Sequence, residues 1–80
     1  MIERKYKIED GRLVRRADGV PVPEDEPLFI FRAKDTNSLS VLISYQMICK
    51  DLNHRAHIKK SIEAFQKFAK DHPERMRDPD

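Results

Sequence analysis

Two cations that precede a run of helix-capping residues form the pattern in this sequence most able to bind a ligand. Arg32 and Lys34 are two positions apart, so on an extended segment both point to the same side. A helix is expected to begin just after them, and the first free amides of a helix attract anions. Arginine adds a forked donor that matches a phosphate group. We therefore predict an anion site made of Arg32, Lys34, Thr36, Asn37 and Ser38.

Two residues from the N-terminal part of the chain are candidates to complete that site. Arg15 supplies a further guanidinium, and Tyr6 supplies a ring on which a base can stack. A simpler reading also stands, in which the cations pair with Asp35 or with the acidic residues 24–26 and no ligand is involved.

Other residue types with chemical potential are scattered. His54 and His57 are three positions apart near an expected helix start, so their rings could face one way, but a metal would need further ligands. Cys49 is the only cysteine and lies in an apolar stretch, where it is expected to pack as a small hydrophobic residue. Phosphate-binding loops, metalloprotease helices and nucleophile elbows are missing from the sequence. We predict no metal site, no cofactor and no enzymatic activity.

The elements that must position these residues begin with a hairpin. Asp10-Gly11 is a strong signal for a two-residue type I′ turn between antiparallel strands. We predict strands over residues 5–9 and 12–16, with Glu9 opposite Arg12 and Ile8 opposite Leu13.

A third strand and two helices are expected after the hairpin. The prolines of residues 20–23 keep that piece extended or at a sheet edge. The apolar run over residues 28–33 predicts a central strand, because it is apolar on both faces. A first helix is expected over residues 38–51 and is apolar nearly all round, while a second, over residues 54–71, is amphipathic.

These elements define a small α+β fold of order ββ-β-α-α, in which the hairpin and the third strand pack on two C-terminal helices. Residues 1–73 form the single domain, because Pro73 ends the second helix, and residues 74–80 form a loosely ordered polar tail.

Size and composition bear on assembly and location. An 80-residue chain has a small core, and one cysteine cannot form an internal disulfide, so we expect a homo-oligomer, a dimer or larger. The balance of 16 basic and 14 acidic residues makes nucleic acid a less favoured partner. Without a leader or a membrane-spanning run, and with its free cysteine, the chain is expected in the cytoplasm.

The segment PEDEPLFIFRAKD, residues 23–35, resembles a pattern in small uncharacterised proteins of phages and prophages, and residues 65–68 and 72–75 are similar too. The resemblance implies an accessory protein that blocks host defences. It implies no binding residue.

Together these features predict a non-catalytic accessory protein, located in the host cytoplasm if phage-encoded, that binds its target stoichiometrically. The more specific form of this hypothesis is sequestration of an anionic, nucleotide-like signal. Direct inhibition of a host protein through the acidic loop and the tail is the alternative, and a small nucleic-acid-binding regulator is a further one.

Overall fold

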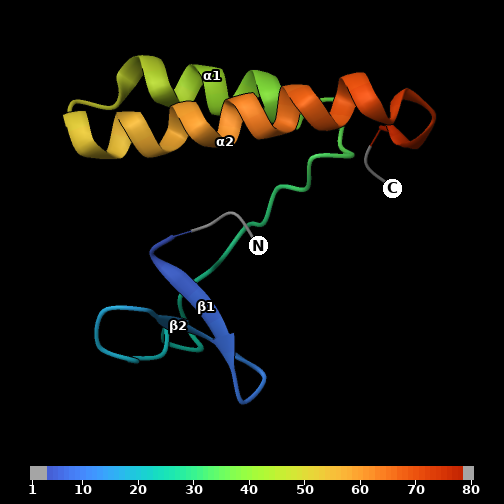
Figure 1. Ribbon diagram of the computed structural model, residues 1–80. Helices are drawn as coiled ribbons and strands as arrows, with labels where there is room; N and C mark the ends of the chain where they lie inside the picture. Colours follow the sequence, from blue (N-terminus) through green and yellow to red (C-terminus); the bar gives the residue numbers. More distant parts are fainter. Residues whose placement is uncertain (1–3, 79–80) are drawn as a thin grey trace.

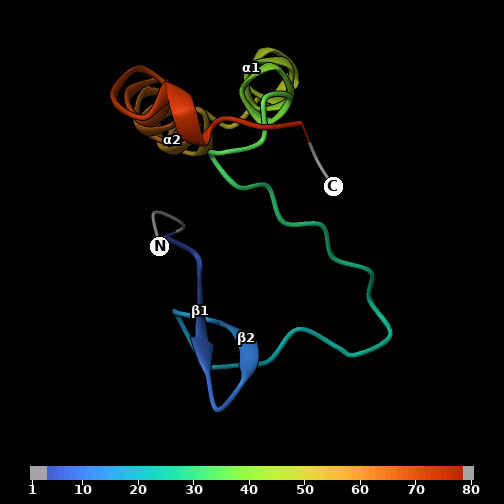
Figure 2. The same cartoon turned by 90° about the vertical axis from the view of Figure 1, so that its right-hand side faces the viewer.

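The computed structural model describes residues 4–78 and contains a β-hairpin, a pair of helices and a long connection between them (Figures 1 and 2). The elements in chain order are β1 (Tyr6–Glu9), β2 (Arg12–Arg15), α1 (Ser38–Ile48), α2 (Leu52–Asp71) and the 3₁₀ turn η1 (Pro73–Arg75). The coarse α+β prediction is confirmed.

The hairpin forms as the Asp-Gly pair predicts. β1 and β2 are antiparallel, with Glu9 opposite Arg12 and Ile8 opposite Leu13. Asp10 and Gly11 have φ angles of 51° and 74°, which is the left-handed pair that a type I′ turn requires. The turn residues therefore set the register of the two strands.

The proline-containing segment after the hairpin lies along the free edge of β2. The Arg15 amide donates to the Val20 carbonyl at 2.9 Å, and the Val22 amide donates to the Leu13 carbonyl at 2.9 Å. Pro21, which has no N–H to donate, forms an isolated bridge with Val14 between these two bonds. Val14 is buried as a result.

The predicted third strand is wrong. Residues 28–33 form no regular strand in the structure and run as an extended strap between the hairpin and α1 (Figure 2). Phe29 and Ile30 are among the most exposed apolar side chains, at 80% and 76%. An apolar run becomes a strand only where another strand pairs with it, and none lies beside the strap within the described residues.

The helices α1 and α2 lie side by side and antiparallel, joined by the short connection at residues 49–51 (Figure 1). Ile58 and Ile62, one turn apart on α2, are buried in the contact. α2 begins at Leu52, two residues before the predicted start, because the Asp51 side chain accepts the His54 amide at 2.9 Å and so caps the helix.

The start of α1 is fixed by the C-terminal segment. Thr36 donates its amide to the Arg77 carbonyl at 2.9 Å, and the Arg77 amide donates to the Lys34 carbonyl at 2.8 Å. Ser38 is only 1% exposed, and its hydroxyl donates to the Asp35 carbonyl at 2.8 Å. The described part of the predicted loose tail, residues 74–78, is thus tied to the chain, while residues 79 and 80 lie outside the described range.

The hairpin does not pack on the helices, contrary to prediction. β1 and β2 contact each other, and α2 contacts α1 and η1, but no contact joins a strand to a helix within the described elements. Within residues 4–78, the helices are too short or too polar to cross a bilayer.

Candidate functional site

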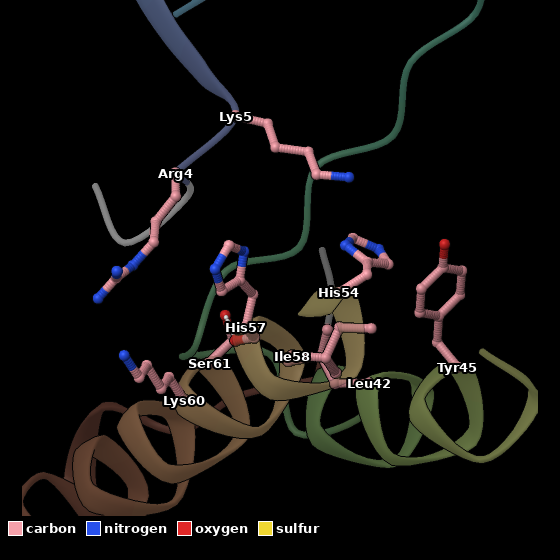
Figure 3. A pocket seen from close by; sticks show the side chains of 9 residues that line it. All are labelled: Arg4, Lys5, Leu42, Tyr45, His54, His57, Ile58, Lys60 and Ser61. Atoms are coloured by element: carbon pink, nitrogen blue, oxygen red, sulfur yellow. Dashed lines mark hydrogen bonds between the residues drawn. The ribbon is translucent and has the colours of Figure 1, made fainter. Parts of the chain in front are cut away.

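Two clefts lie where residues 4 and 5, the described part of the segment before β1, approach the helical pair and the hairpin. The first has a volume of about 180 Å³ and opens between that segment and the upper face of the helices (Figure 3). The second, of about 570 Å³, lies against the open end of the hairpin. Both are lined by Arg4 and Lys5, so they adjoin each other. The second cleft is of the size that small-molecule sites have in proteins.

The first cleft has an apolar floor and a polar rim (Figure 3). Leu42 from α1 and Ile58 from α2 form the floor. The rim side chains rise from the helices toward the segment before β1; the full lining is Arg4, Lys5, Leu42, Tyr45, His54, His57, Ile58, Lys60 and Ser61.

The helical periodicity of α2 brings its rim residues to one side. His54, His57, Lys60 and Ser61 recur at intervals of three and four, so they occupy one face of the helix. The inference that the two imidazoles could face one way is therefore confirmed. Within residues 4–78 no three histidine, cysteine, aspartate or glutamate side chains gather closely enough to hold a metal ion.

The charge of the first cleft has one sign. Arg4, Lys5 and Lys60 line it, and its lining includes no carboxylate. In the described part of the chain no ion pair is found for Arg4 or Lys60. Cations gathered in a cleft with low-dielectric walls concentrate the positive potential, so the cleft attracts anions.

An aromatic pair stands at one end of the cleft. The rings of Tyr45 and His54 are 5.7 Å apart between centroids and nearly perpendicular, at 86°. The Nδ1 atom of His54 is buried and has no hydrogen-bond partner in the described structure. A buried polar atom without a partner is uncommon in folded proteins and calls for an explanation.

The carboxylate of Asp51 lies beside this end of the cleft. The hydrogen bond from the His54 amide is the main cause that lowers the pKa of Asp51 below its ordinary value, and Lys5 adds a smaller attraction. Desolvation acts in the opposite direction. The Asp51 carboxylate therefore serves as the N-cap of α2.

The predicted site residues Tyr6 and Arg15 line the second cleft, where β1 and β2 place them directly opposite each other. Arg15 forms an ion pair with Asp18. Arg16, on the same wall, donates from Nε to the Tyr6 carbonyl at 3.1 Å. The guanidinium groups of Arg15 and Arg16 thus have partners within the N-terminal part of the chain.

The other predicted site residues lie at the start of α1 and line neither cleft. The amides expected to receive an anion there are already used, since the Asn37 amide donates to the Asp35 carboxylate at 2.8 Å and the Ser38 amide donates to the Asp35 carbonyl at 3.1 Å. The Thr36 hydroxyl donates to Asp78 at 2.5 Å. A ligand held by Arg32 and Lys34 stays a prediction, but these amides would have to leave their present acceptors to join it.

Sequence reasoning missed the cationic cleft because its members come from distant segments. Arg4 and Lys5 precede the hairpin, Tyr45 lies on α1, and the remaining rim residues lie on α2. One signal was present, namely the H-x-x-H-x-x-K-S spacing of residues 54–61, which places two imidazoles, an ammonium and a hydroxyl on one helix face.

Comparison of the chain with protein-family models, with curated proteins and with solved structures found no match. The function has to be argued from the geometry of the clefts.

Proposed function

We propose that the chain binds an anionic, nucleotide-like ligand in the first cleft and holds it without converting it. The observation that carries the proposal is the lining itself, in which three cations, two imidazoles and a phenol meet with no carboxylate among them. Ammonium and guanidinium groups form charge-assisted hydrogen bonds with phosphate oxygens.

Each part of such a ligand has a matching feature. Lys60 and Arg4 suit the phosphate, and the apolar floor formed by Leu42 and Ile58 suits a base or sugar. The ring of Tyr45, next to the imidazole of His54, adds a stacking surface. Because the first cleft, at about 180 Å³, is smaller than typical small-molecule sites, the ligand would extend into the adjoining second cleft.

The role proposed for this binding follows from the resemblance of residues 23–35 to small phage proteins. A protein that binds a nucleotide signal stoichiometrically would lower its free concentration and so weaken a host defence that depends on it. The imidazoles of His54 and His57 are also groups that can act in acid–base catalysis. Sequestration is distinguished from catalysis because the ligand is released chemically unchanged.

Binding of a host protein is the second candidate, and the exposed strap favours it. Phe29 and Ile30 are exposed beside the acidic residues 24–26, so this segment offers an apolar centre with a charged rim. A host protein with a basic rim around an apolar groove would fit it.

Calorimetry against a panel of cyclic and linear nucleotides, with a short oligonucleotide included, tests the proposal. We expect one nucleotide to bind saturably and to be recovered intact by chromatography. Lys60→Ala should weaken binding about 10-fold or more, as expected for loss of a charged contact. The control is Lys67→Ala on the same helix, where Lys67 pairs with Asp71 at 2.5 Å and lines neither cleft.

The outcomes separate the candidates. Weakening by Arg32→Ala but not by Lys60→Ala would move the ligand to the start of α1. Binding of only the oligonucleotide, with a steep dependence on salt, would favour the nucleic-acid regulator. Chemical change of the ligand would replace sequestration with catalysis, and no binding by any panel member would leave the host-protein candidate ahead.

A further inference from the structure

The helix α1 carries no charge. Residues 38–49 contain no aspartate, glutamate, lysine or arginine, although 38% of the whole chain is charged. A helix that faces water normally has a polar, charged side. Depletion of charge is instead typical of the centre of a protein–protein interface.

The uncharged surface of α1 points away from α2. Leu39, Leu42 and Gln46 are partly covered on the side toward α2. The opposite side, which we call the outer face of α1, is exposed, with Met47 at 77% and Ile48 at 74%. Its members occupy one continuous arc of the helix: Ser40, Val41, Ile43, Ser44, Met47 and Ile48.

The surface area of the chain shows how much of it a partner could cover. A compact monomer of 9.5 kDa exposes about 5,000 Å². This chain exposes 6633 Å², an excess of roughly 1,600 Å². A standard interface takes about 800 Å² from each partner, so the excess is larger than one partner's share of such an interface.

We propose that the outer face of α1 is the contact through which a second copy of this chain docks, α1 against α1 about a two-fold axis. A two-fold contact brings a surface against itself, so a face without charges meets no repulsion there. Ser40 and Ser44 lie one turn apart in the middle of the arc, and their small side chains let the two helices approach closely while Met47 and Ile48 pack around them. The proposal is independent of the ligand, because most of the first cleft is built by α2 and the segment before β1.

Sedimentation at micromolar concentration tests the contact. The parent chain should sediment as a dimer, and Met47→Lys, which places an unpaired charge in the apolar part of the contact, should raise the dissociation constant at least about 100-fold. Gln66→Lys is the matched control, because it adds the same residue at an exposed position of α2 and should leave the dimer intact. Circular dichroism should show both variants folded, since Met47 is largely exposed in the single chain.

Cysteine cross-linking tests which residues of the two copies lie close together, and its result does not depend on how a substitution changes the stability of the dimer. In a Cys49→Ser background, Ser44→Cys should give a covalent dimer on mild oxidation, while Gln66→Cys should not. A monomer at all concentrations overturns the proposal. So does a dimer that survives Met47→Lys but is lost in Phe29→Ser, because the strap would then be the interface.

Discussion

At the scale of single residues, the turn of the hairpin depends on backbone conformation alone. Gly11 has φ 74°, and a Cβ placed there would meet nothing within 4 Å. A β-branched residue would therefore fit the space but not the backbone angle.

Gly11→Val should destabilise the hairpin by about 1 kcal/mol or more. Because the hairpin does not pack on the helices, amide exchange of β1 and β2 is a better measure than melting of the whole chain. Arg12→Val is the control, since it adds the same side chain at a strand position with ordinary geometry. Unchanged protection in Gly11→Val would mean that the turn is built differently.

Asp51 gives the start of α2 a dependence on pH. Its pKa is lowered in the folded chain, mainly by the hydrogen bond from the His54 amide, so its contribution to stability is present above about pH 4 and is lost as the pH falls through the folded value. Asparagine caps helices equally well without titrating.

We expect Asp51→Asn to lose less stability than the parent chain between pH 6 and pH 3 in thermal melts. Asp25→Asn serves as the control, because Asp25 is exposed and has no hydrogen bond in the described structure. If both variants follow the parent equally, the cap does not form as described.

At the scale of elements, patterns that report local geometry predicted the structure well. The Asp-Gly turn gave the hairpin and its register, the capping run gave the start of α1 at Ser38, and Pro73 gave the end of α2 at Asp71. The strap could not be predicted in this way. An apolar run over residues 28–33 indicates a strand, but whether another segment lies beside it depends on the whole fold.

The candidate site shows the same limit. The opposition of Tyr6 and Arg15 followed from hairpin pairing, which is local. The first cleft is built from three separate segments. Arg4 and Lys60 line it together although they are far apart in the sequence, so no local spacing pattern predicts that they meet.

The packing of α1 on α2 rests on very few residues. Ile58 and Ile62 are the only buried apolar residues of the two helices within the described range. Ile62→Ala should therefore cost about 2–5 kcal/mol of unfolding free energy in urea titrations at constant protein concentration. Gln66→Ala, at an exposed position one turn further on, should stay within about 0.5 kcal/mol of the parent. Equal effects of the two substitutions would place the core elsewhere.

At the scale of the whole molecule, the chain is expanded for its length. Its radius of gyration is 13.9 Å, against about 11.6 Å for a compact chain of 80 residues. The hairpin and the helical pair stand apart, and the strap runs between them (Figure 2). A ligand in the first cleft would contact both Arg4 and α2, so its binding should draw these parts together.

The proposed anion lies between the segment before β1 and α2. Amide chemical-shift mapping by NMR, with the tightest-binding nucleotide of the panel, tests this placement most directly. Saturable shifts are expected at Lys5, His54, His57 and Ser61, while the amides of Thr36, Asn37 and Ser38 should not move. Shifts confined to residues 36–38, or no saturable shift at any amide of the cleft, would contradict it.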